Sequence, residues 1–379
     1  MKRVYLDNAA TTPLSKEAES AMAKYFSEEF GNADSRHVDG RAAAAALSSA
    51  RERIAHCLNA SFEEIYFTSG GTESDNWALK GAALRHGRGR LAVSAVEHPA
   101  VFESAKQLER LGYGLTVIPV DGECAVDMRA VEKACRDAFL VSVMTANNET
   151  GRIQPVREIA RLCRSRGVLF HTDAVQAAGC LPLDVRELDV DMLSLSAHKF
   201  GGPKGFGVLY IKNGVRTEAL LSGGEQERGR RGGTSDVAGA VGTAAALCEA
   251  VRCMSSESAR VRGLKEGFAR RVLGGISGAR LNGTLDKESS LPGIVNFLFD
   301  GITGEELLFS LDLSGISASN GSACSAGSSE PSRTLVAMGV SPSEAKGAVR
   351  FSFGRANTEE DVSSAYDALF AAVNRLRKM

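Results

Sequence analysis

The stretch VLFHTDAVQ (168–176), followed by DMLSLSAHKFGGPKG (191–205), decides the fold. Each stretch opens with an apolar run of strand length and ends in polar residues, a pattern typical of a buried strand in a sheet covered by helices. Asp173 and Lys199 follow these runs. The pattern therefore places both residues at the carboxyl ends of strands, where α/β sheets bind ligands.

The same alternation extends along the chain from about residue 40. Helical stretches such as VREIARLCRSRG (156–167) alternate with short β-branched runs such as FLVSVMTA (139–146). The run FGVLYIK (206–212) is predicted to be a late strand that returns along the same sheet. The sequence thus predicts an α/β fold with a mostly parallel sheet covered by helices.

The rhythm changes after Cys253, where a glycine-rich stretch (274–283) precedes the strand-like IVNFLF (294–299) and another helix. A chain of 379 residues is long enough for two domains of unequal size. We place a large domain at 14–255 and a small α+β domain at 1–13 plus 256–379, and we expect the two to pack as one rigid unit.

The charge composition excludes nucleic acid as a partner. Lysine and arginine number 45 against 46 aspartate and glutamate, a formal net charge of −1, whereas binding of a phosphate backbone needs a net basic face. Asp7 interrupts the N-terminal segment before a signal-peptide core can form, and no stretch approaches the roughly 18 to 20 apolar residues of a membrane span. We therefore expect a cytoplasmic protein without a membrane partner.

The eight cysteines are scattered, without a CxxC pair or a histidine at zinc-ligand spacing, so we expect no metal site. Seven of them lie mostly among apolar residues, as Cys163 does, and we expect buried, unreactive thiols there. Cys324 is the exception, because its neighbours are small or polar, as in an exposed loop.

Asp173 and Lys199 together suggest a pyridoxal phosphate site. This cofactor needs a lysine that forms an imine and an aspartate that keeps the ring nitrogen protonated. A lysine in a half-buried loop of small residues loses solvation and shifts toward its neutral, nucleophilic form. Neither residue is specific alone, because many strand-end aspartates are structural and many such lysines are simply solvated.

The segment SGGTES (69–74), between a predicted strand and a helix predicted to begin near Glu73, is a candidate phosphate loop. Gly71 and the glycine before it let the backbone approach an anion, and the helix N-terminus offers free N–H groups. Thr72 adds a hydroxyl, and Ser196 and His198 offer further donors. A glycine turn before a helix is more often a plain connection, so the prediction depends on the accompanying aspartate and lysine.

His98, in VEHPAV, follows a strand and precedes a helix opened by Pro99. A ring at this edge of the sheet could stack on the cofactor and move protons. The alternative is a histidine that caps the helix or is satisfied in the core.

Eight motifs in one order carry a resemblance to a known family. They are YLDNAATTP (5–13), FTSGGTES (67–74), EHPAV (97–101), NNETGRIQP (147–155), HTDAVQ (171–176), SAHKFGGPKGFG (196–207), GGEQERGRRGGT (223–234) and GSACSAG (321–327). The chain resembles the cysteine desulfurases of the NifS/IscS type, in the class V aminotransferase family, from residue 4 to about 370. The resemblance implies the pyridoxal-phosphate fold type I, with a seven-stranded sheet, and a homodimer.

The resemblance also implies roles for individual residues. Lys199 would bind pyridoxal 5′-phosphate covalently and move protons, Asp173 would bind the ring nitrogen, and His98 would stack on the ring. Gln176 would bind the phenolic oxygen of the cofactor. The phosphate of the cofactor would be bound by Gly71, Thr72, Ser196, His198 and the other subunit's Thr234. Asn148 and Arg350 would bind the substrate carboxylate.

Cys324 resembles the family's nucleophile, which attacks the sulfur of L-cysteine, keeps it as a persulfide and releases L-alanine. The persulfide sulfur would pass to an acceptor protein such as an iron–sulfur scaffold. The stretch from Cys324 to Pro331 suits the long-loop branch of the family. RGGT (231–234) stands where many relatives have RSGT, and it keeps Thr234. The chain stops soon after its last helix, so we expect a segment that docks the sulfur acceptor to be absent or short, and the resemblance defines the acceptor least of all its implications.

Three hypotheses remain open. The first is a cysteine desulfurase. The second is another reaction on the same fold, selenocysteine lyase or aminotransferase chemistry, because fold alone does not decide function. The third is a non-catalytic sulfur carrier or scaffold subunit, which the presence of Lys199, Asp173, His98 and Cys324 disfavours.

Overall fold

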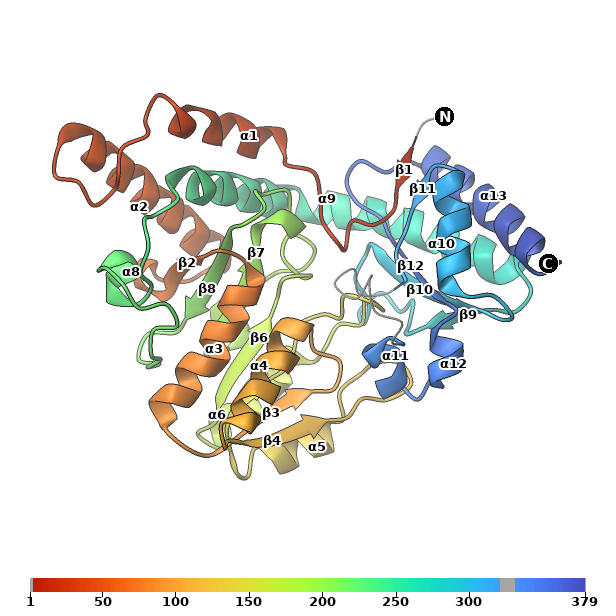
Figure 1. Ribbon diagram of the computed structural model, residues 1–379, viewed down its shortest axis with the longest axis horizontal. Helices are drawn as coiled ribbons and strands as arrows, with labels where there is room; N and C mark the ends of the chain where they lie inside the picture. Colours follow the sequence, from red (N-terminus) through yellow and green to blue (C-terminus); the bar gives the residue numbers. More distant parts are fainter. Residues whose placement is uncertain (1–2, 321–330, 379) are drawn as a thin grey trace.

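The computed structural model describes residues 3–320 and 331–378, and its largest element is a seven-stranded sheet (Figure 1). The strands lie in the order β2-β8-β7-β6-β5-β3-β4, and β8 alone in this sheet runs antiparallel to its neighbours. The predicted mostly parallel sheet is confirmed. Its strands are β2 Ile65–Thr68, β3 Arg90–Ser94, β4 Gly114–Ile118, β5 Ala138–Ser142, β6 Leu169–Asp173, β7 Met192–Ser196 and β8 Gly207–Ile211.

The sheet is buried on both faces, which explains its nearly continuous apolar strands. Successive residues of β8 show this, because Val208 and Tyr210 belong to one apolar cluster while Leu209 and Ile211 belong to another. Helices α3 and α4 supply the second cluster, and α2, α6 and the first part of α9 supply the first. The helices of this part are α1 Lys16–Met22, α2 Val38–Leu58, α3 Gly71–His86, α4 Pro99–Arg110, α5 Met128–Ala134, α6 Val156–Ser165, α7 Val185–Leu188, α8 Gln226–Gly229 and α9 Val237–Gly275.

A second, smaller unit is built on a three-stranded antiparallel sheet in the order β12-β10-β9. The N-terminal strand β1 joins this unit by pairing in parallel with β11. The elements of this unit are β1 Val4–Tyr5, β9 Ala279–Asn282, β10 Ile294–Phe299, α10 Gly304–Leu313, β11 Ile316–Ser317, α11 Arg333–Ala337, α12 Pro342–Ala345, β12 Ala348–Ser352 and α13 Glu359–Leu376.

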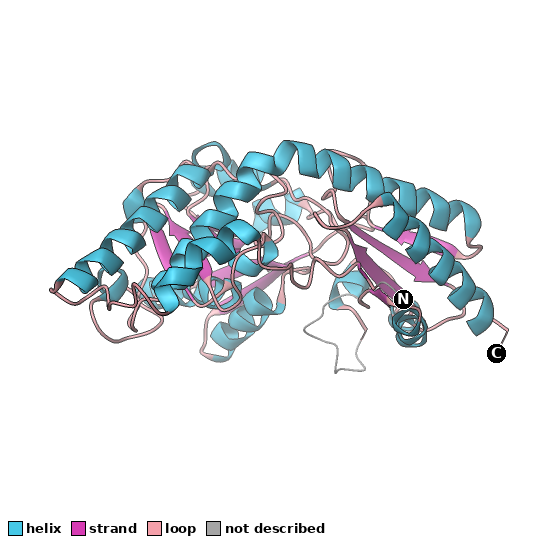
Figure 2. Cartoon of the chain, turned by 90° about the horizontal axis from the view of Figure 1, so that it is seen from above, coloured by secondary structure: helices cyan, strands magenta, loops and turns pink. Residues whose placement is uncertain are grey.

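Helix α9 connects the two units as one continuous 39-residue helix, which Figure 2 shows running across both. Ala250 packs in the core of the large unit, whereas Val261 packs in the core of the small one. Val4 and Leu6 also pack in the small core. The predicted domain boundary near residue 255 therefore falls inside a helix rather than in a linker.

The composition of α9 corrects one expectation from the sequence. This helix is long and apolar enough to cross a membrane, with a window of mean hydropathy 1.4 in the described residues. Within that window 61% is buried inside the fold, as in a core helix.

Candidate active site

A cavity of about 400 Å³ opens at the carboxyl ends of the parallel strands. The chain reverses at this edge between β2 and α3, β3 and α4, β6 and the following turn, and after β7. The predicted site residues that line the cavity are Gly71, Thr72, His98, Asn148, Asp173, Gln176, Ser196, His198, Lys199 and Arg350. Thr234 is not among the lining residues, and Cys324 lies outside the described residues.

The glycine turn between β2 and α3 brings bare backbone to the cavity wall. Helix α3 begins at Gly71, two residues earlier than the sequence predicted, so its N-terminal N–H groups are at this wall. Gly70 has a φ of +151°, which favours glycine. A Cβ atom at Gly71 would lie 2.9 Å from Cγ2 of Val175 and 3.3 Å from Cβ of Ser196. Gly71 therefore has no room for a side chain, and the backbone of the turn itself lines the cavity.

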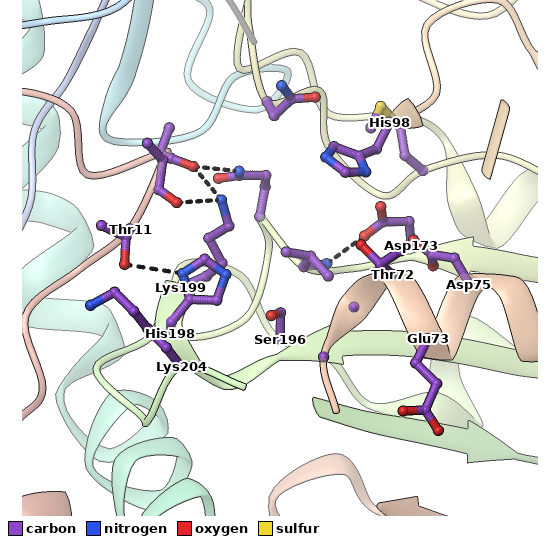
Figure 3. Close-up of a pocket in the computed structure, with 18 of the residues that line it drawn as sticks. Thr11, Thr72, Glu73, Asp75, His98, Asp173, Ser196, His198, Lys199 and Lys204 are labelled. Atoms are coloured by element: carbon purple, nitrogen blue, oxygen red, sulfur yellow. Dashed lines mark hydrogen bonds between the residues drawn. The ribbon is translucent and has the colours of Figure 1, made fainter. Parts of the chain in front are cut away.

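Lys199 sits in a one-turn 3₁₀ helix directly after β7. Its Nζ donates to the carbonyl oxygens of Ala9 at 2.5 Å and Ala10 at 2.9 Å, and Gln176 Nε2 donates to the Ala9 oxygen at 3.0 Å. Figure 3 shows these contacts beside the cavity. The N-terminal segment, which belongs by packing to the small unit, thus orients the lysine of the large unit.

Two histidines at the cavity are neutral at pH 7. Burial, together with the charges of Lys199 and Lys204, lowers the pKa of His198 to about 4. Burial also lowers the pKa of His98 to about 4, helped by the charges of Lys199 and Arg333. His98 is the N-cap of α4 and accepts the Ala100 N–H at Nδ1, so its ring proton is on Nε2. Capping and a place in the site, the two alternatives from the sequence, therefore coexist.

Asp173 is the last residue of β6 and is 5% exposed. Its Oδ1 accepts the N–H of Val175 at 2.9 Å. Burial raises the pKa of Asp173 to about 6, although that hydrogen bond and the charge of Lys199 favour the ionised form. Figure 3 places Lys199 and Asp173 on opposite sides of the cavity, as a ligand held at two ends requires.

Arg350 comes from β12 of the small unit and is 1% exposed. Its Nη1 donates to the carbonyl oxygen of Asn148 and its Nη2 to Oδ1 of Asp7, both at 2.8 Å. Its Nε has no hydrogen-bond partner among the described residues. A buried guanidinium fixed by two protein oxygens, with an N–H left over, is prepared to bind a carboxylate.

These residues come from distant parts of the sequence. A family model for Aminotransferase class-V matches residues 4–364. The chain belongs to the class V aminotransferase family.

Relatives of this class V protein carry one recurring name. The chain is 46% identical to "Cysteine desulfurase IscS" of Dictyoglomus turgidum and 43% identical to "Cysteine desulfurase IscS" of Clostridium botulinum. Each alignment covers all of this chain and 96% of the relative. Among solved structures, a "NIFS-LIKE PROTEIN" has a TM-score of 0.92 at 37% identity, covering 98% of this chain and all of the other. "SspA in complex with cysteine" has a TM-score of 0.82 at 34% identity, covering 93% and 99%.

Three residues of the class V site were not found from the sequence. Asp75 lines the cavity one helical turn after Gly71, a spacing that could have pointed to it. Thr11 lines it as well, with Oγ1 3.1 Å from Nδ1 of His198. Asp7 lies behind Arg350, and its pairing across 343 residues leaves no local signal.

Thr234 lines a neighbouring cavity of about 190 Å³, with Ser69 and Gly205 common to both cavities. It therefore does not reach the site of its own chain in this class V enzyme. The role of Thr234 at the phosphate site of a second subunit therefore stays a prediction.

The expectation of seven buried cysteines is wrong for four of them. Cys124, Cys135 and Cys163 are buried, whereas Cys57, Cys180, Cys248 and Cys253 are half-buried. Two pairs have neighbouring sulfur atoms, at 3.4 Å between the α2 and α9 cysteines and 3.6 Å between the two buried ones on α6 and after α5. Sequence spacing could not show these pairs, because each joins different helices.

Proposed function

We propose that this enzyme is a cysteine desulfurase that converts L-cysteine to L-alanine and retains the sulfur as a persulfide on Cys324. The observation that carries the proposal is a single cavity in which Lys199, Asp173 and the buried Arg350 meet, in a chain 43 to 46% identical to proteins named cysteine desulfurase. The solved relative in complex with cysteine supports the choice of substrate.

Pyridoxal phosphate is the cofactor of this family, and the described residues fit it. The glycine turn and the N-terminus of α3 line the cavity, and Thr72, Ser196 and His198 add polar groups to the same wall, as binding of a phosphate requires. Asp173 suits the ring nitrogen, and Lys199 supplies the amine. When bound, pyridoxal phosphate supplies an electron-withdrawing ring that stabilises negative charge at the substrate Cα.

The residues of this chain divide the remaining work. Lys199 would hold the cofactor covalently and would move a proton at the substrate Cα. Neutral His98 would stack on the ring and has a proton on Nε2 to donate. Arg350 and Asn148, which both line the cavity, would orient the substrate carboxylate.

The sulfur step balances without a further oxidant. The Cys324 thiolate attacks the sulfur of L-cysteine, an S–S bond forms, and the Cβ–S bond breaks with its electron pair left on the carbon side. A proton then completes the methyl group of L-alanine. The products are L-alanine and a persulfide on Cys324, and a reductant or an acceptor protein removes the terminal sulfur in the next step.

Mass spectrometry of the protein after brief exposure to L-cysteine tests this function. One added sulfur atom on the peptide of Cys324 and one L-alanine released per site are expected. Cys324→Ala should keep the cofactor absorbance and lose both products, whereas Cys253→Ala, which changes a half-buried cysteine on α9, should change neither. A keto acid product that is indifferent to Cys324→Ala would instead indicate an aminotransferase. Turnover of selenocysteine alone would indicate a lyase.

We also propose a homodimer in which Thr234 of each subunit completes the phosphate site of the other. Its support is that Thr234 lies beside its own cavity without lining it. Mixed dimers of Lys199→Ala and Thr234→Ala chains test this. Because one site of each mixed dimer would be intact if the site is shared, activity should reappear on mixing. Failure to recover activity from a mixture shown to form heterodimers would contradict the proposal.

The sulfur acceptor is proposed to be a protein such as an iron–sulfur scaffold, and the place of action the cytoplasm. Support for the acceptor comes from the resemblance to the NifS/IscS type, and support for the location from the sequence alone. Transfer of ³⁵S from the labelled persulfide to a purified scaffold protein is the direct test. Retention of all label on the enzyme in the presence of the scaffold would exclude that acceptor.

A further inference from the structure

Three buried carboxyl groups gather at one end of the cofactor cavity. Asp75 in α3 is 1% exposed, Glu97 before α4 is 1% exposed, and Asp173 at the end of β6 is 5% exposed. One carboxylate oxygen of Asp75, one of Asp173 and one ring nitrogen of His98 all lie within 4.8 Å of one another. Only Asp173 has a role in the function proposed above, so the nearby Asp75 needs its own explanation.

Two buried carboxylates this close cannot both be ionised without a compensating cation. His171 is the nearest basic side chain, with Nε2 3.6 Å from Oδ1 of Asp75. Its ring nitrogens contact the hydroxyls of Ser142 at 2.8 Å and Ser194 at 3.0 Å. Burial lowers the pKa of His171 to about 3, so this ring is neutral and offers Asp75 no charge.

The other neighbours assign the shared proton to Asp75. Burial, followed by the charges of Asp173 and Glu97, raises the pKa of Asp75 well above its usual range, although a hydrogen bond with Ser194 opposes the shift. His98 is neutral, and the charge of Lys199 favours the ionised form of Asp173. Asp173 also has the N–H of Val175 as a donor, whereas Oδ1 of Asp75 has no hydrogen-bond partner among the described residues.

We propose that Asp75 is a positioning residue that remains protonated in the holoenzyme and donates a hydrogen bond to Asp173, orienting that carboxylate toward the ring nitrogen of the cofactor. The pair then carries one negative charge, which matches the single positive charge of a protonated ring nitrogen. The inference rests on the cofactor assignment of the proposed function and on the role of Asp173 in it. It does not depend on which sulfur acceptor or which nucleophile the enzyme uses.

Two substitutions separate the proton from the carboxyl. Asp75→Asn keeps the size and a donor toward Asp173, so it mimics the protonated acid. Asp75→Ala removes the donor. Cofactor affinity, measured by titrating pyridoxal phosphate into each apoprotein, should change by less than about threefold in Asp75→Asn and weaken by about tenfold or more in Asp75→Ala. The visible absorbance of the bound cofactor should match wild type in Asp75→Asn between pH 6 and 8 and differ in Asp75→Ala.

Asp75→Asn that behaves like Asp75→Ala would overturn the proposal, because an ionised Asp75 loses its charge in both variants. Wild-type affinity and spectrum in Asp75→Ala would overturn it as well. Circular dichroism of the apoproteins controls for folding, and if Asp75→Ala fails to fold, the comparison of Asp75→Asn with wild type still decides whether the proton is present.

A double-mutant cycle with Asp173→Asn tests whether Asp75 acts through Asp173. Once Asp173 carries no charge, Asp75→Ala should weaken cofactor binding by less than about threefold more, because the group that it orients is gone. A full tenfold effect in the Asp173→Asn background would show a merely structural role and overturn the proposal. If the wild-type protein forms no persulfide while the cofactor affinities of the variants follow the pattern above, that result would count against the desulfurase function alone. The two failures are therefore distinguishable.

Discussion

Replacement of Glu97 by glutamine should stabilise the apoprotein in a pH-dependent way. The Glu97 carboxyl is 1% exposed, its Oε1 accepts from the Ser94 hydroxyl and from the Met144 N–H at 2.8 Å, and its Oε2 has no hydrogen-bond partner among the described residues. Burial raises the pKa of Glu97 from 4.5 to about 8, although those two hydrogen bonds oppose the shift. The folded protein therefore retains a proton that the unfolded chain has lost.

The sign of the effect follows from that proton. Between pH 4.5 and about 8 the folded state binds one proton more at Glu97, so the free energy of unfolding falls as pH rises, by about 1.4 kcal/mol for each pH unit. At pH 7 the loss amounts to about 3 kcal/mol. Glutamine has no proton to bind, and its amide oxygen can keep both hydrogen bonds, so Glu97→Gln should gain up to this amount over wild type.

Urea unfolding of the apoproteins from pH 5 to pH 8 measures the difference. The advantage of Glu97→Gln should be small at pH 5 and grow through pH 7, whereas Glu52→Gln, which changes an exposed residue of α2, should show no such trend. An advantage that is the same at every pH would refute the reasoning, because it would mean that Glu97 has the same proton affinity in both states.

Two further substitutions test other parts of the site, and one labelling experiment tests a cysteine pair outside it. Arg350→Lys loses the planar fork that contacts a backbone carbonyl and a carboxylate, so the KM for L-cysteine should rise by about tenfold or more while the cofactor absorbance is retained; an unchanged KM would contradict the substrate role. Gly71→Ala places a methyl group 2.9 Å from a valine methyl, so cofactor affinity should fall in a fluorescence titration, whereas Gly263→Ala, with open space around it, should leave the affinity unchanged. Cys248 should be alkylated by iodoacetamide faster than Cys57 at pH 7, because the hydrogen bond from Cys57 lowers the pKa of Cys248 to about 6. Peptide mass spectrometry measures the two rates, and equal rates would contradict this expectation.

The sheet could be predicted from the sequence because each of its strands satisfies the same local rule. In β8, alternate residues face two different cores, so the strand must be apolar throughout, and the run FGVLYIK shows this without knowledge of its partners. The domain boundary is harder, because α9 keeps one helical pattern from Val237 to Gly275 while its packing partners change between Ala250 and Val261. No change of composition marks that point, since both halves bury the same kinds of side chain.

The candidate site was predictable where a residue follows a strand or begins a helix, and not where its partner is remote. Asp173 and His98 are visible in this way, because strand ends at one edge of a parallel sheet converge. The N-terminal segment brings Thr11 to the cavity and Asp7 to Arg350, and its path depends on the pairing of β1 with β11 more than three hundred residues later. Such contacts are set by tertiary structure, which short-range patterns do not encode.

The charges of the cavity, taken together, form a dipole that matches the cofactor. Glu73 is paired with Arg231 at 2.9 Å and Arg350 with Asp7 at 2.8 Å, so these charges cancel locally. His198 is neutral, so the charge of Lys204 and the N-terminus of α3 create an excess of positive potential beside the glycine turn, where an anion would bind. At the other end neutral His98 and His171 add no positive charge beside Asp173, whose ionised form the charge of Lys199 favours. An anionic phosphate and a cationic ring nitrogen on one rigid molecule suit this arrangement, whereas a ligand with the reverse polarity would meet repulsion at both ends.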